Sequence, residues 1–103
     1  MGRSERRKGR DGEAEVAAIF RRYGFEVRGL EGSGDHLVFG RGLRLHVESK
    51  RCETARPWAW IKQAESEAPP STLPVVAFRR SHEQWYAIVP LAPLLDELDV
   101  VLL

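Results

Sequence analysis

The stretch from Leu43 to Lys50 most constrains the fold, because apolar and polar residues alternate along it. Side chains of a β-strand point alternately to its two faces. The alternation therefore predicts a strand with Leu43, Leu45 and Val47 on one face. The other face then carries Glu48 and Lys50, about 7 Å apart along the strand. The apolar face can rest on a core while an acid and an amine project together.

Asp35 stands thirteen residues before Glu48, between a Gly-Ser-Gly turn and a short apolar run. A hairpin through residues 40–42 would bring the two acids together. Adjacent carboxylates repel unless a cation joins them, and hard oxygen ligands suit Mg²⁺ or Mn²⁺. The Lys50 amine then fits a water-activating or charge-stabilising role in phosphodiester hydrolysis. An acid and a lysine close together on a strand often do no more than lie on its solvent-exposed face. Here the glycine-flanked Asp35 and a preceding acidic helix favour a metal nuclease.

The acidic helix is predicted over residues 11–23, beginning at Asp11 or Gly12 and ending before a glycine. Glu13 precedes three apolar residues by three, four and seven positions, so it lies on the inward-facing stripe. An acid on such a stripe is costly unless it is paired, hydrogen-bonded or near a metal. Glu15 is predicted to point the opposite way, to solvent with Arg22.

The remaining periodicity predicts the order α-β-β-β-α-β-β-α with five strands. Strands are expected at 25–28, 37–39, 43–50, 73–78 and 84–89, and further helices at 57–67, entered through Pro57, and at 91–98. The apolar end Val100–Leu103 is expected to form an edge strand or to cover a subunit interface. Trp58 and Trp60 are read as core residues or as an exposed pair that binds a partner subunit or stacks on bases.

Composition describes one soluble domain of 103 residues, with 43% hydrophobic and 30% charged residues. The single cysteine, Cys52, excludes an intrachain disulfide and a cysteine zinc site, which favours a reducing, cytoplasmic setting. No apolar run reaches the length of a spanning helix, and no signal-peptide core is present. A membrane protein is therefore not expected.

Charge is distributed unevenly along the chain. Residues 1–10 contain five basic residues and one acid, whereas residues 81–103 contain four acids and no Lys or Arg. Residues 1–9 are read as a basic flexible arm, which is either a solvated tail or a segment that tracks phosphates. The candidate phosphate contacts are Arg3, Arg6, Arg7, Lys8 and Arg10. Gln63, in the second predicted helix, is either a surface residue or a group that reaches nucleic acid or a metal-bound water.

Four motifs in this order resemble the PD-(D/E)XK nucleases, and among them the archaeal-type Holliday junction resolvases, a group also found in viruses. The resemblance covers most of the chain. The motifs are Lys8-Gly9-Arg10-Asp11-Gly12-Glu13, Tyr23-Gly24-Phe25-Glu26-Val27, Gly32-Ser33-Gly34-Asp35-His36-Leu37-Val38 and His46-Val47-Glu48-Ser49-Lys50. Ala14 departs from the family, whose members often carry Arg there.

The resemblance implies a restriction-endonuclease-like fold, with a central mixed five-stranded sheet flanked by helices. It implies that Asp35, Glu48 and the Ser49 carbonyl bind Mg²⁺ or Mn²⁺, that Glu13 helps to place the metal or its waters, and that Lys50 assists the attacking water. Further DNA contacts are expected at Ser33, Arg51 and Gln63. The expected activity is symmetric cleavage of four-way DNA junctions by an intracellular homodimer. The alternatives are a small endonuclease of the same fold acting on duplex, nicked or flapped DNA, and a non-catalytic DNA-binding module.

Overall fold

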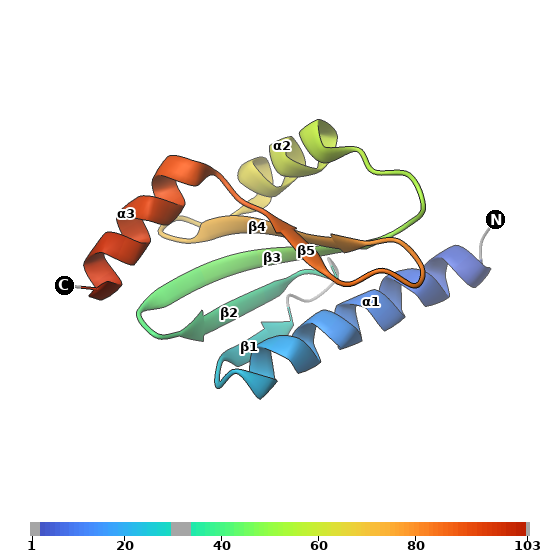
Figure 1. Ribbon diagram of the computed structural model, residues 1–103, viewed down its shortest axis with the longest axis horizontal. Coiled ribbons are helices and arrows are strands. Elements are labelled where there is room, and N and C mark those ends of the chain that lie inside the picture. The colour runs from blue at the N-terminus through green and yellow to red at the C-terminus, as the bar shows by residue number, and fades with distance from the viewer. Residues whose placement is uncertain (1–2, 30–33, 103) are drawn as a thin grey trace.

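The computed structural model describes residues 3–29 and 34–102, and it shows an α/β domain whose mixed sheet is flanked by helices (Figure 1). The predicted order of helices and strands is confirmed. The elements are α1 (Arg3–Arg22), β1 (Glu26–Gly29), β2 (His36–Gly40), β3 (Leu43–Arg51), α2 (Pro57–Glu67), β4 (Leu73–Arg79), β5 (Tyr86–Ile88) and α3 (Leu91–Leu102).

The five strands follow one another across the sheet in chain order. Every neighbouring pair is antiparallel except β3 and β4, which run parallel. A parallel pair needs a crossover connection, and α2 supplies it. One core cluster joins Val16 of α1 to Leu45 and Val47, and a second joins Trp60 and Ala64 of α2 to β4. Helices α1 and α2 therefore cover opposite faces of the sheet.

The β2–β3 hairpin turns tightly at Arg41 and Gly42, whose φ angles are +52° and +79°. Two left-handed residues in a two-residue loop match the twist of the flanking strands. The ladder runs from Gly40 opposite Leu43 to His36 opposite Val47. Continued by one position, it sets Asp35 beside Glu48, as the predicted hairpin requires.

Helix α1 begins at Arg3, eight residues before the predicted start at Asp11. The prediction of a flexible arm over residues 1–9 was therefore wrong for residues 3–9, while Met1 and Gly2 lie outside the described residues. The reason is local: this segment has no proline and is rich in Arg, Lys and Glu, which favour helix, and Gly9 is the single weak position. Helix α1 consequently extends past the end of the sheet (Figure 1).

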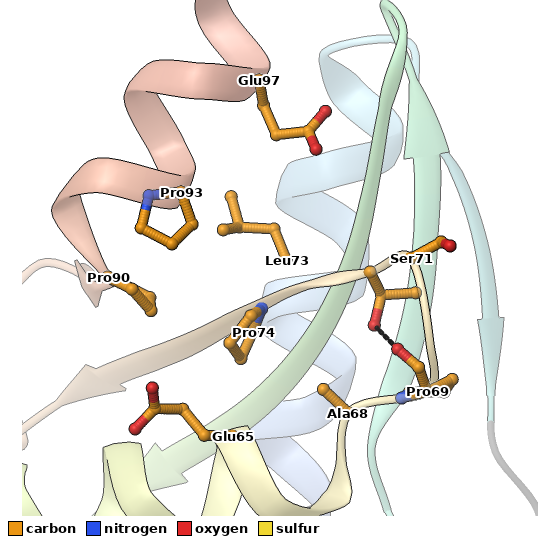
Figure 2. Close-up of a pocket in the computed structure, with 10 residues that line it drawn as sticks. Glu65, Ala68, Pro69, Ser71, Leu73, Pro74, Pro90, Pro93 and Glu97 are labelled. Carbon is orange, nitrogen blue, oxygen red and sulfur yellow. Dashed lines mark hydrogen bonds between the residues drawn. The ribbon is translucent and has the colours of Figure 1, made fainter.

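The C-terminal end is helical as well, because α3 continues to Leu102. Of the two alternatives for Val100–Leu103, the edge strand was therefore wrong for residues 100–102, and coverage of a subunit interface stays a prediction. Leu91 and Leu95 of this helix are 69% and 54% exposed, and the side chains from residue 99 onward lie outside the described residues. A cavity of about 350 Å³ lies between α3, the end of α2 and the loop before β4, and its lining includes proline residues (Figure 2).

The two tryptophans of α2 differ in their surroundings. Trp60 is 8% exposed, and its ring centroid lies 5.6 Å from that of Phe78 in β4. Trp58 is 78% exposed. The core prediction is thus confirmed for Trp60 and wrong for Trp58, because the helix turns its first residues away from the sheet.

Candidate metal centre

Three carboxylates meet on the α2 side of the sheet. Asp35, Glu48 and Glu67 each offer an oxygen, and these oxygens lie within 4.8 Å of one another. Asp35 and Glu48 are only 8% and 2% exposed. Such burial does not fit the alternative of a solvated strand face for Glu48, because buried acids are rare unless they are paired or bind a cation.

Three different elements position these acids. Asp35 immediately precedes β2, Glu48 lies in β3, and the β2–β3 hairpin aligns them. Glu67 is the last residue of α2, which starts beyond the end of β3 and runs back over the sheet (Figure 1). The crossover needed for the parallel β3–β4 pair therefore also brings the third carboxylate to the first two.

Glu67 was not among the predicted site residues. A signal existed, because an acid at the C-terminal end of a helix opposes the helix dipole, and the last turn of α2 contains no basic residue. Gln63, a predicted contact, is exposed one turn earlier, and its Nε2 donates a hydrogen bond of 3.1 Å to Glu67 Oε1. Gln63 therefore borders the cluster.

His46 is a second residue that the motif analysis did not assign. It is 1% exposed, and its Nε2 lies 3.1 Å from Asp35 Oδ2. Residues 46 and 48 share a strand face, so the imidazole lies on the same side of β3 as Glu48. A buried imidazole that holds a carboxylate in one orientation is typical of the groups behind metal ligands.

The electrostatics of the cluster favour a cation. Burial, a hydrogen bond with Glu67 and the nearby Asp35 raise the pKa of Glu48 to about 8. Burial also raises the pKa of Asp35, although His46 opposes the shift. The hydrogen bond from Glu48 lowers the pKa of Glu67. Without a metal, a protonated Glu48 thus donates to Glu67.

One oxygen of the cluster lacks a hydrogen-bond partner. Glu48 Oε2 is fully buried and accepts no hydrogen bond from the described part of the chain. A buried acceptor without a partner costs free energy, and a divalent cation coordinated by this oxygen would remove that cost. The donor set, made of carboxylates, suits Mg²⁺ or Mn²⁺.

Glu13 lies beside this cluster. The φ of Gly34 is +77°, which favours glycine, and the Glu13 carboxylate lies directly against Gly34, the residue before Asp35. Burial and the charge of Asp35 raise the pKa of Glu13. Its inward placement agrees with the helical periodicity, and its role in placing the metal or its waters stays a prediction.

Lys50 follows Glu48 on the same face of β3 and is half-buried. Its charge lowers the pKa of both Asp35 and Glu48, although burial outweighs it in each case. Ser49 points to the opposite face, and its Oγ is buried without a partner among the residues described. A metal contact from the Ser49 carbonyl stays a prediction.

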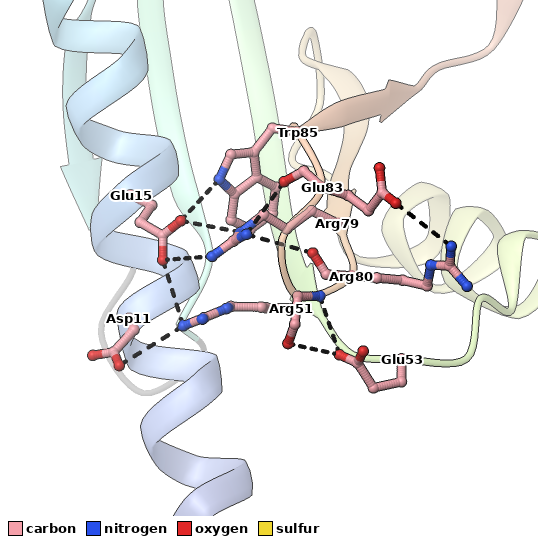
Figure 3. Close-up of polar contacts among 9 residues, drawn as sticks. Asp11, Glu15, Arg51, Glu53, Arg79, Arg80, Glu83 and Trp85 are labelled. Atoms are coloured by element: carbon pink, nitrogen blue, oxygen red, sulfur yellow. Dashed lines mark hydrogen bonds and ion pairs between the residues drawn. The ribbon is translucent and has the colours of Figure 1, made fainter.

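The prediction for Glu15 was wrong, because this residue does not point to solvent with Arg22. Its carboxylate accepts a hydrogen bond of 3.1 Å from Trp85 Nε1 and lies 3.1 Å from Arg79 Nε (Figure 3). Arg51 Nη1 lies 3.5 Å from the same carboxylate. Arg51 and Arg79 are paired in register, and two adjacent guanidinium groups need an anion between them.

This network holds Arg51 in ion pairs with other residues of the protein. Its guanidinium contacts Glu15 and lies 3.9 Å from Asp11, and its side chain is 21% exposed. A structural role therefore fits Arg51 better than the expected DNA contact. Arg7 and Arg10 are exposed on α1. The side chains of Arg3, Arg6 and Lys8, and the whole of Ser33, lie outside the described residues.

Comparison of the chain with models of known protein families and with curated sequences gives no significant match. No helix in the described part of the chain is long and apolar enough to cross a membrane.

We expect the raised pKa of Glu48 to make the metal-free protein less stable as pH rises. The unfolded side chain releases its proton near pH 4.5, whereas the folded one keeps it until about pH 8. Between these values the folded state binds more protons, so the free energy of unfolding falls with rising pH and levels off above that window. The midpoint of thermal unfolding, measured in chelator from pH 5 to 9, would show this fall.

Glu48→Gln should remove most of the fall, because glutamine stays neutral at every pH. The variant should then unfold at a higher temperature than the wild type at pH 8 without metal. Glu65→Gln, on the same helix as Glu67 but outside the carboxylate cluster, should follow the wild-type curve. Parallel curves for the wild type and Glu48→Gln would contradict the assigned pKa.

Proposed function

We propose that this protein is a Mg²⁺- or Mn²⁺-dependent DNA endonuclease of the PD-(D/E)XK type that acts on branched DNA, with four-way junctions as its main substrate. The observation that carries the proposal is the buried Asp35–Glu48 pair. Glu48 Oε2 has no hydrogen-bond partner among the residues described, and Lys50 lies on the same strand face. The element order and the mixed sheet support the assignment of the fold.

Asp35, Glu48 and Glu67 would hold the cation. When bound, it would lower the pKa of a coordinated water and offset the charge that develops on the phosphate. His46 fixes the orientation of the Asp35 carboxylate through the 3.1 Å contact. Lys50 places a positive charge beside the carboxylates, where it can orient the attacking water or stabilise a phosphate oxygen.

A four-way junction favours a two-fold dimer. Such a junction is resolved symmetrically when two strands are cut, and each chain carries one acidic cluster among its described residues. Two sites related by a two-fold axis match this substrate. The exposed Leu91 and Leu95, one helical turn apart on α3, supply apolar surface for the contact.

The deciding experiment measures metal-dependent cleavage of a supercoiled plasmid, a linear duplex, a flap and a synthetic four-way junction. Symmetric cutting of the junction, lost in chelator and in Glu48→Gln, is the expected result. Cutting of duplex or flap alone would favour the small endonuclease. Binding without cleavage of any of these substrates in Mg²⁺ or Mn²⁺ would overturn the nuclease proposal and leave a DNA-binding module.

The basic start of α1 should contribute phosphate contacts. Arg7 and Arg10 are exposed and lie three residues apart, so the helix presents them on one side. Deletion of residues 2–7 should weaken DNA binding and reduce the slope of log affinity against log salt by about 0.9 per lost contact. Fluorescence anisotropy titrations at several salt concentrations measure the slope.

The double substitution Arg7→Gln and Arg10→Gln tests the same contacts without shortening the helix. Arg28→Gln serves as the control, because Arg28 is also exposed but lies on β1 and pairs with Glu26. A salt slope unchanged by both the deletion and the double substitution would show that this end of α1 is only a solvated segment.

A further inference from the structure

A cavity of about 480 Å³ lies at the end of β4, and its wall includes Phe78, which also packs against the cluster of Trp60 and Ala64. The rings of Phe78 and Tyr86 form part of its wall, and their centroids lie 6.1 Å apart. Tyr86 is 51% exposed. The cavity therefore offers an accessible aromatic face.

The sheet register connects this cavity to the candidate metal centre. Lys50 is paired with Phe78, and Phe78 is paired with Tyr86. Paired residues on neighbouring strands point to the same face, which is also the face of Glu48. Neighbouring strands lie about 4.8 Å apart, so the Tyr86 backbone lies about 10 Å across the sheet from that of Lys50. A DNA strand held at the metal centre would reach the cavity by passing the N-terminal end of α2, where Trp60 packs against Phe78.

The charged groups around the cavity already form ion pairs or hydrogen bonds within the protein. Arg80 Nη2 lies 3.7 Å from Glu83 Oε1, and Arg79 is held by Glu15 (Figure 3). Glu53 accepts hydrogen bonds from the Ser81 amide and hydroxyl, at 3.2 and 3.0 Å. Two arginines and two glutamates line the cavity, so its charges balance. This environment favours a neutral, flat group over a phosphate.

Nucleobases fit this description. Every base has a π-face that stacks on aromatic side chains, with little dependence on sequence. Glutamate oxygens accept hydrogen bonds from the amino groups of bases. We propose that the cavity at Phe78 and Tyr86 takes an unpaired base next to the cleavage site, an inference that rests on the proposed action on branched DNA.

The test compares the binding of a fully paired duplex with that of a fork of equal length carrying unpaired bases at the branch, by anisotropy in chelator. Tyr86→Ala should weaken binding of the fork about tenfold and leave the duplex unchanged. Tyr86→Phe should bind both as the wild type does, because it keeps the ring. Tyr23→Ala, which removes a tyrosine that is 60% exposed at the end of α1, should change neither.

A photo-crosslink gives a second readout that does not depend on a variant. A fork with iodouracil at the unpaired position should crosslink to Tyr86 or Phe78 in the wild-type protein. Absence of that crosslink, or equal weakening of fork and duplex by Tyr86→Ala, would overturn the base site. Because binding is measured without metal, this result is separate from cleavage. If the protein never cleaves DNA but binds the fork more tightly than the duplex through Tyr86, the base site stands and the proposed nuclease activity is rejected.

Discussion

Glu48→Gln is expected to abolish metal-dependent DNA cleavage and to leave DNA binding intact or tighter. The substitution keeps the size of the side chain but removes a charge from a residue that is 2% exposed and central to the cluster. Loss of a partner behind a metal ligand typically costs 10–100-fold in activity, so loss of the ligand itself should cost more than about 100-fold. Binding should survive because metal-free Glu48 stays protonated until about pH 8, so glutamine adds no negative charge near the phosphate, and in the metal-bound protein it removes one. Single-turnover cleavage and anisotropy measure the two effects separately.

Asp35→Asn should behave in the same way, and Lys50→Ala should lower the rate with less effect on metal affinity. Near-normal cleavage by Glu48→Gln would reject the metal assignment. Glu13→Gln should also be damaging, because Glu13 borders Asp35. Glu15→Gln is not a neutral control for it, since Glu15 holds Arg79 and Trp85 in place.

Glu67 and Glu65 form a matched pair within this first prediction. Both are exposed and lie on α2, but only Glu67 contributes an oxygen to the cluster. Glu67→Gln should therefore weaken Mn²⁺ binding, measured by calorimetry, while Glu65→Gln should not. Equal metal affinity of the two variants would reduce the site to Asp35 and Glu48.

The second large effect is expected on assembly. The wild-type protein should have a mass near twice 11.7 kDa in solution, and Leu95→Glu should convert it to a monomer that binds junctions poorly. Leu95 is 54% exposed, and Leu91 lies one turn before it on α3. A charge at this position would have to be buried without a partner in an apolar interface, which is strongly unfavourable. Light scattering coupled to size exclusion gives the mass.

Pro93→Glu is the control for this variant, since it adds the same charge at an exposed position of α3 that lies two residues from both Leu91 and Leu95, on the other side of the helix. It should remain dimeric. A wild-type protein that is monomeric at micromolar concentration and still cleaves junctions would reject the dimer. Such a result would favour an enzyme that makes one cut for each binding event.

The sequence predicted the features that depend on short-range patterns. The alternation from Leu43 to Lys50 defined β3, and the glycines around Arg41 indicated the hairpin that pairs Asp35 with Glu48. The burial of Trp60 followed from helical spacing. These predictions succeeded because each depends on residues within about one supersecondary unit.

The features that were missed depend on contacts between distant segments. Glu15 contacts Arg79, which is 64 residues away, and no local pattern contains that pair. Glu67 joins the metal cluster because of the path of α2 over the sheet. The starting point of α1 was missed for a different reason, since a run of charged residues is compatible with both a helix and a solvated arm.

The turn at Arg41 and Gly42 has a consequence for how the site can vary. It lies six residues from Asp35, about 20 Å along the strand, yet it determines which residue faces Glu48. A single residue inserted there would shift the ladder by one position and send the Asp35 side chain to the opposite face. The length of this loop therefore determines whether Asp35 faces Glu48. An insertion in the loop, far from the carboxylates, would remove the site although the sequence would still contain every residue of it.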